Sequence, residues 1–163
     1  MWKVKSCNPA PNTFCSAVLK TPRRACVVDG KTDRAVWCVR VAKAIAPIDP
    51  DARARTAVSP DGHYLVVVAW APVYRPSQNV VFAYRDGKLI WRLRASEAIE
   101  ERDVRLLVND KENWLAGAVI QKQGVVTIFG GETIVREFNL DTGKFIREVA
   151  IPHSPAEAIR KAK

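Results

Sequence analysis

The residues of this sequence that could carry acid–base or nucleophilic chemistry are two histidines and four aspartates in turn-like segments. His63 follows a Ser-Pro-Asp-Gly segment and His153 lies near the C-terminus, and neither has a spacing that links it to a serine or cysteine nucleophile. The sequence contains no Gly-x-Ser-x-Gly elbow, no Walker phosphate loop and no His-Glu-x-x-His pair. Aspartate bonds its own backbone in bends, so turns explain these aspartates better than catalysis or calcium binding. We therefore expect no catalytic residue, metal or cofactor; the aspartates are Asp61, Asp86, Asp110 and Asp141.

The four cysteines, Cys7, Cys15, Cys26 and Cys38, all lie in the first quarter of the chain. An even number in a segment rich in turn residues favours two disulfides and an oxidising compartment. Pairing of neighbours, Cys7 with Cys15 and Cys26 with Cys38, would close short loops, although four cysteines allow three connectivities. Buried free thiols are the alternative, and zinc is disfavoured because there is no Cys-x-x-Cys pair. We expect a periplasmic or secreted protein in its mature form, because nothing at the N-terminus resembles an export signal, with a cytoplasmic protein as the alternative.

A second group of residues could bind another protein. The segment from Trp70 to Pro76 joins two expected strands and combines aromatic residues and an arginine with prolines that stiffen it. Interface hot spots are enriched in these residue types, and a stiff loop loses less entropy on docking. In the next repeat, the segment from Gln121 to Gly131 is expected to protrude on the same side. The expected partner-binding residues are Trp70, Tyr74, Arg75, Gln121, Gln123 and Phe129.

The stretch from Thr56 to Arg94 predicts four β-strands. Ser59-Pro60-Asp61-Gly62 is typical of a type I turn, and the β-branched and aromatic run that follows it, from His63 to Trp70, is typical of a buried strand. Val80–Tyr84 and Lys88–Leu93 flank Asp86-Gly87, a pair that favours a type I′ hairpin. The stretch is therefore expected to form one antiparallel meander.

The same order of elements recurs on both sides of this meander. After it, strands are expected over Val104–Asn109, Asn113–Ile120, Glu132–Leu140 and Lys144–Val149, with an additional hairpin inserted around residues 123–131. Asp141 follows Asp86 by 55 residues, and Asp29 precedes Asp86 by 57. Repetition at this period is the sequence sign of a propeller or an array. Residues 96–102 are expected to form one or two helical turns with Ser96 as the N-cap.

The Ser-Pro-Asp-Gly turn before an apolar strand, followed by a hairpin of the type Asp-Gly-Lys-Leu-Ile-Trp, resembles the blade repeats of bacterial WD40-like and TolB-like β-propellers. The resemblance implies an all-β fold of four-stranded antiparallel meanders. Propellers need about four to eight blades, whereas this chain holds at most three units. Either a second chain completes the ring, for which a homodimer is one expected form, or the units pack as a β-sandwich.

Length and composition bound the domain organisation and the partners. With 163 residues and 48% hydrophobic content, we expect a single domain over residues 1–163, with units at 1–41, 56–94 and 104–151. No apolar run approaches the roughly 20 residues that span a bilayer. The net charge of +9 is spread along the chain, which disfavours nucleic-acid binding and fits steering toward an acidic protein.

Three functions remain open at this point. The expected one is a non-catalytic protein-binding module, in particular a bacterial inhibitor or immunity-type protein that blocks a partner. The second is a structural subunit or fragment of a larger propeller. The third is a small-ligand-binding protein or enzyme with a site at the ends of the sheets.

Overall fold

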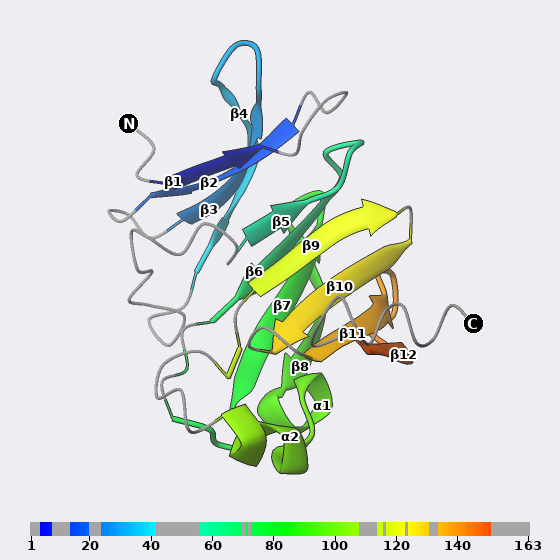
Figure 1. The fold of residues 1–163 in the computed structure, drawn as a ribbon. Helices are drawn as coiled ribbons and strands as arrows, with labels where there is room; N and C mark the ends of the chain where they lie inside the picture. The colour runs from blue at the N-terminus through cyan, green and yellow to red at the C-terminus, as the bar shows by residue number, and fades with distance from the viewer. Residues whose placement is uncertain are drawn as a thin grey trace, which may run out of the picture.

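The fold consists of three four-stranded antiparallel sheets and two short helices (Figure 1). The computed structural model describes residues 4–7, 14–19, 24–41, 56–69, 71, 73–107, 114–115, 117–122, 124–130 and 134–150. Sheet 1 contains β1 (Val4–Cys7), β2 (Phe14–Leu19), β3 (Arg24–Asp29) and β4 (Ala35–Arg40). Sheet 2 contains β5 (Thr56–Val58), β6 (Tyr64–Val68), β7 (Asn79–Arg85) and β8 (Lys88–Arg94). Helices α1 (Ala95–Ala98) and α2 (Glu101–Leu107) precede sheet 3, which contains β9 (Gly117–Lys122), β10 (Val125–Gly130), β11 (Ile134–Asn139) and β12 (Phe145–Ala150).

Within each sheet the strands pair in sequence order, as in a meander. Sheet 2 lies between the other two, and its first strand, β5, contacts both sheet 1 and strand β9 of sheet 3. The all-β, propeller-like repeat architecture expected from the sequence is therefore confirmed, and the sandwich alternative does not describe these three separate sheets.

Strand β6 of sheet 2 is buried on both faces, which explains its uninterrupted apolar run. Leu65 and Val67 belong to a core cluster shared with sheet 1. Val66 and Val68 belong to a second cluster shared with sheet 3. Because successive side chains of a strand point to opposite faces, a strand between two packed sheets needs apolar residues at every position.

The turns between the third and fourth strands lie at equivalent places but are of two kinds. Asp86 and Gly87 have φ values of 48° and 82°, so both turn residues are left-handed, as the type I′ prediction requires. In sheet 3 the Asn139 side chain accepts hydrogen bonds from the Asp141 and Thr142 amides instead.

The turn of sheet 1 repeats the turn of sheet 3. The Asp29 side chain accepts hydrogen bonds from the Lys31 and Thr32 amides, as Asn139 does two repeats later. The two turns also share their backbone bonds, because Asp33 N donates to Asp29 O and Gly143 N donates to Asn139 O. The first and third repeats are thus more alike here than either is to the second.

A tryptophan in the outer strand joins each sheet to the next. Trp37 pairs with Val27 and Trp91 with Ala83, each beside the register shift of its sheet. The Trp37 indole donates to the carbonyl of Gly62 over 3.0 Å. The Trp91 indole donates to Leu140 O over 2.7 Å. We call these two hydrogen bonds the indole latches, because each ties one sheet to a turn of the following sheet.

Sheet 3 departs from this pattern at the equivalent position. Arg147 pairs with Glu137 beside the register shift, so it replaces the latch tryptophan. Its Nε donates to Glu137 Oε2 over 2.7 Å, which is a bond within sheet 3.

One of the predicted disulfides is confirmed. Cys26 and Cys38 are direct cross-strand partners in β3 and β4, and they are bonded to each other. Cys15 is also disulfide-bonded, and its backbone lies opposite that of Cys7. The side chain of Cys7 lies outside the described part of the structure, so its pairing stays a prediction.

The prediction for residues 104–131 was wrong about which segments form the strands. Val104 belongs to the helix α2, which spans Glu101–Leu107, and not to a strand. The segment that was expected to form an inserted hairpin is instead β10, the second strand of the sheet. Its residues Val126 and Ile128 are fully buried. Sheet 3 consequently begins at Gly117, and the expected turn at residues 109–113 lies outside the described residues.

The helical turns expected at residues 96–102 exist, with a different cap. The N-cap of α1 is Arg94 and not Ser96, and the Glu97 carboxylate accepts a hydrogen bond from the Arg94 amide over 2.7 Å.

The expected core tryptophans also pack inside: Trp114 is buried, and Trp91 is half-buried against the core.

We expect that Trp91→Phe will destabilise the protein by about 1–3 kcal/mol, because the Leu140 carbonyl loses its donor and the smaller ring leaves a gap. Urea unfolding followed by circular dichroism measures the change. Leu89→Ala is the control on the same strand, since Leu89 is exposed and its truncation should cost no more than about 0.5 kcal/mol. An unchanged urea midpoint for Trp91→Phe would show that the latch adds nothing to stability.

We expect the double variant Cys26→Ser, Cys38→Ser to lose roughly 3 kcal/mol, because the crosslink closes a short loop in the unfolded chain. Thermal unfolding of the wild type with and without a reducing agent should show a fall at least as large, because reduction also opens the disulfide of Cys15. If reduction leaves the melting temperature of the wild type unchanged, the crosslink does not contribute to stability.

Candidate functional site

Four turns of sheets 2 and 3 gather at one end of the molecule, opposite the two helices (Figure 1). They join β5 to β6, β7 to β8, β9 to β10 and β11 to β12. We call this region the turn end. The turns are bonded to one another: Asp86 N donates to His63 O over 2.9 Å, and Leu140 N donates to Gly124 O over 2.8 Å.

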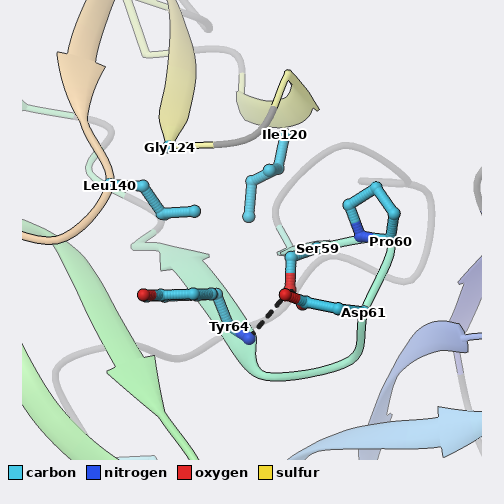
Figure 2. Close-up of a pocket in the computed structure, with 7 residues that line it drawn as sticks. All are labelled: Ser59, Pro60, Asp61, Tyr64, Ile120, Gly124 and Leu140. Atoms are coloured by element: carbon cyan, nitrogen blue, oxygen red, sulfur yellow. Dashed lines mark hydrogen bonds between the residues drawn. The ribbon is translucent and has the colours of Figure 1, made fainter.

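A pocket of about 300 Å³ opens at the turn end between sheets 2 and 3 (Figure 2). Ile120 and Leu140 form the wall from sheet 3, and Tyr64 forms the wall from sheet 2. The β5–β6 turn closes the remaining side. Among the described residues, the lining is Ser59, Pro60, Asp61, Tyr64, Ile120, Gly124 and Leu140.

The β5–β6 turn is fixed by a local hydrogen-bond network. Ser59 Oγ donates to Asp61 Oδ1 and accepts from the Tyr64 amide over 2.9 Å. The His63 amide donates to the same Asp61 oxygen over 3.0 Å. Partial burial raises the pKa of Asp61, but the bonds from Ser59 and the His63 amide outweigh it, and the pKa lies below its ordinary value of 3.8. Asp61 is therefore ionised at neutral pH.

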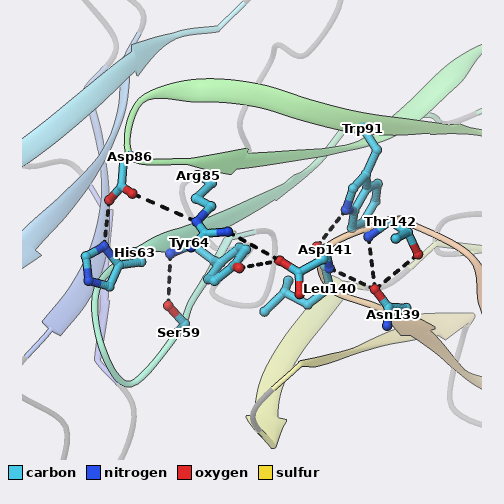
Figure 3. Close-up of polar contacts among 10 residues, drawn as sticks. All are labelled: Ser59, His63, Tyr64, Arg85, Asp86, Trp91, Asn139, Leu140, Asp141 and Thr142. Atoms are coloured by element: carbon cyan, nitrogen blue, oxygen red, sulfur yellow. Dashed lines mark hydrogen bonds and ion pairs between the residues drawn. The ribbon is translucent and has the colours of Figure 1, made fainter.

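A second network crosses from sheet 2 to sheet 3 (Figure 3). The Tyr64 hydroxyl donates to Asp141 Oδ1. The Arg85 guanidinium lies over the Tyr64 ring, 5.3 Å from its centre, and 3.7 Å from the same Asp141 oxygen. The hydrogen bond to Asp141 and partial burial raise the pKa of the Tyr64 hydroxyl. The phenol therefore remains a proton donor at neutral pH.

His63 and Asp86 form the outermost pair of this network. His63 Nδ1 lies 2.7 Å from Asp86 Oδ1, and both side chains are exposed. The hydrogen bond and the negative charge of Asp86 raise the pKa of His63 above 6.5.

The expected binding residues of the Trp70–Pro76 loop lie at the other end of sheet 2. The Tyr74 ring packs edge-on against Trp114, with ring centres 5.1 Å apart, and its hydroxyl is buried. Trp114 in turn donates to Ala71 O. Tyr74 is thus partly an anchor of its own loop, whereas Arg75 is exposed, and Trp70 lies outside the described residues. Their role in binding a partner stays a prediction.

The second expected segment does not protrude. Gln121 lies in β9 as part of the sheet, and Phe129 lies half-buried in β10, opposite Val135 and Gly117. Gln123 lies outside the described residues. The segment of sheet 3 that corresponds to the Trp70–Pro76 loop joins β10 to β11, because that loop joins β6 to β7. It spans residues 131–133, also outside the described part. The segment from Gln121 to Gly131 therefore does not form a protruding loop beside the Trp70–Pro76 loop.

The sequence did not single out Tyr64, Arg85 or the pocket. The turn signals at Pro60 and Gly87 predict where the chain reverses, but not that the turns of two repeats lie together. The 55-residue period was the one available signal, since equivalent turns in packed repeats must lie at the same end.

Among the described residues, no group of three histidine, cysteine, aspartate or glutamate side chains could hold a metal ion. Within the same part of the chain, neither helix has the length and apolar composition needed to cross a bilayer.

No protein-family model matches the sequence, and no curated protein matches it. Solved structures are similar to it in fold. Hydrazine synthase of Kuenenia stuttgartiensis has 14% identity and a TM-score of 0.53, over 92% of this chain and 36% of that chain. BamB of Moraxella catarrhalis has 10% identity and a TM-score of 0.48, over 90% and 34%. The RRP9 WD40 repeats have 10% identity and a TM-score of 0.49, over 87% and 36%.

The chain spans about a third of the length of these structures. At 14% identity the match to hydrazine synthase shows a shared fold alone. Together with three meanders in successive repeats, it places this chain among all-β repeat proteins with propeller-like sheets.

We expect the His63 ring to titrate above 6.5 in the folded protein, and Asp86→Asn to bring its pKa back toward 6.5, because Asp86 is the largest cause of the shift. Proton NMR of the ring measures both values. A raised folded pKa means that the stabilisation by this pair is complete below about pH 6.5 and is lost as pH rises through the folded pKa. Equal pKa values in the two proteins would contradict the pairing.

Proposed function

We propose that this protein is a non-catalytic protein-binding module that contacts its partner with the turn end of sheets 2 and 3. The supporting observation is a set of exposed apolar side chains near the start of the outer strands β8 and β12. Leu89 and Ile90 follow the β7–β8 turn directly, and Phe145 and Ile146 follow the β11–β12 turn. These four side chains are 37–50% exposed.

Single exposed apolar residues are ordinary, but here they recur at equivalent places in neighbouring sheets. In both outer strands they directly follow the turn lysine, Lys88 or Lys144. Exposed apolar side chains with charged residues close by match the organisation of protein interfaces. The turn end offers such a surface on a rigid support, because its turns are bonded to each other.

The polar groups of the turn end favour binding over catalysis. Tyr64 donates to Asp141, His63 pairs with Asp86, and Ser59 bonds Asp61. A general base or nucleophile must reach a substrate atom, whereas these groups are directed toward one another. The same pairing holds the turns in one conformation, which lowers the entropy cost of docking.

The finer functional expectations remain predictions within this proposal. An inhibitor or immunity-type role fits a module that covers a partner surface. An acidic partner fits the net charge of +9. A periplasmic or secreted location fits the disulfide between Cys26 and Cys38.

A structural role in a larger propeller is a second candidate. Its support is the share of the similar structures that the chain spans, about a third. A ring completed by a second copy would give a homodimer, which light scattering would detect. The pocket is the feature that a small-ligand-binding protein would use.

The test is quantitative capture of partners from extracts of the source organism. We expect Leu89→Asp with Ile146→Asp to lose a captured protein by about tenfold or more, because a charge is placed in the apolar contact. Val36→Asp is the matched control, since Val36 is 54% exposed but lies in sheet 1. Circular dichroism confirms that each variant is folded.

Two outcomes would overturn the assignment of this surface. One is equal capture by the wild type and the turn-end variant. The other is selective loss with Arg75→Ala, which would place the partner on the Trp70–Pro76 loop instead.

A further inference from the structure

The pocket at the turn end combines apolar walls with a single carboxylate. Ile120, Leu140 and Pro60 supply aliphatic surface, and Tyr64 supplies an aromatic ring. Asp61 is the one carboxylate among the described lining residues, and its side chain lies on the pocket side of the β5–β6 turn (Figure 2). Ligand sites are commonly built in this way, with mostly apolar walls and few polar groups that fix orientation.

Asp61 keeps a free acceptor. The hydrogen bonds from Ser59 Oγ and from the His63 amide both end on Oδ1. No other described residue donates a hydrogen bond to Oδ2. A carboxylate has about four lone-pair sites, so it can still accept from a cationic donor.

The chain itself shows how a guanidinium packs in this region. The Arg85 guanidinium lies over the Tyr64 ring and within 3.7 Å of Asp141 Oδ1 (Figure 3). Aromatic rings attract such cations, and carboxylates pair with them. The pocket presents the same two partners, the Tyr64 ring and a carboxylate, to a group that comes from outside.

We propose that this pocket accepts a lysine or arginine side chain of the partner protein, with the aliphatic stem against Ile120 and Leu140 and the cationic group on Asp61 Oδ2. The proposal deepens the proposed function and rests on it for the identity of the ligand as part of a protein. A pocket of about 300 Å³ is large enough for one long side chain. The expectation concerns one side chain and is compatible with a partner that is acidic overall.

The test uses small probes in place of the partner. Butylguanidinium carries the arginine head group on an aliphatic stem, and butylurea is its neutral counterpart of similar shape. We expect butylguanidinium to shift the backbone amide signals of Gly62, Tyr64 and Gly124 saturably in NMR spectra of the folded protein. Butylurea should bind more weakly by about tenfold or more, because the charge-assisted hydrogen bond is missing.

Asp61→Asn is the decisive variant, because the amide oxygen can still accept the two bonds that hold the turn while the charge is lost. We expect about tenfold weaker binding of butylguanidinium to this variant. Asp86→Asn is the matched control: it also removes one exposed turn carboxylate, but Asp86 does not line the pocket. Its effect should remain below about twofold, since exposed charges are screened.

Three results would overturn the proposal: no saturable shifts at these amides, equal binding of butylurea, or equal weakening by Asp61→Asn and Asp86→Asn. None of them requires the partner protein. A failure here therefore leaves the capture experiment with Leu89→Asp and Ile146→Asp unaffected, and failure of that experiment leaves the probe titration interpretable.

Discussion

Burial of strand β6 of sheet 2 on both faces is the constraint on which the rest of the structure depends. Leu65 and Val67 pack toward sheet 1, while Val66 and Val68 pack toward sheet 3. Packing on both faces fixes the order of the three sheets and the position of their ends relative to one another. The indole latches of Trp37 and Trp91 then join each outer strand to a turn of the following sheet. Alignment of the turns follows from this stacking, and the pocket follows from alignment of the turns.

Under the proposed function, the residues of the structural turns at the turn end also form the binding surface. Asp61 closes its own turn through Oδ1, and its side chain also lines the pocket. Tyr64 fixes sheet 2 to sheet 3 through Asp141 while its ring forms a wall of the pocket. In both cases one atom has a structural role and another part of the side chain remains available. Rigidity and availability together are what a protein-binding site needs, because a preformed surface loses little entropy on docking.

Much of the fold could be predicted because its signals are local. Asp86-Gly87 defines a hairpin since both residues must take positive φ, and the apolar run from Tyr64 to Val68 defines a buried strand. The failure at Val104–Leu107 has a physical reason: a short segment with spaced apolar residues fits a helix and a strand equally well, and the acidic residues before it favour a helix start. The glycines that flank residues 125–130 predict an inserted hairpin. In the structure, Gly124 instead lies in the turn that leads into β10, the second strand of sheet 3.

By itself, the sequence determined the class of the elements, the positions of the tight turns and the period that relates them, because each depends on backbone preferences of neighbouring residues. It also indicated the pairing of Cys26 with Cys38, which a hairpin brings together. Only the tertiary structure decided that Tyr64 and Asp61 face Ile120 and Leu140 across a pocket, since these residues belong to different sheets. Contacts between distant repeats depend on how the sheets stack, and no local pattern encodes the side on which two turns meet.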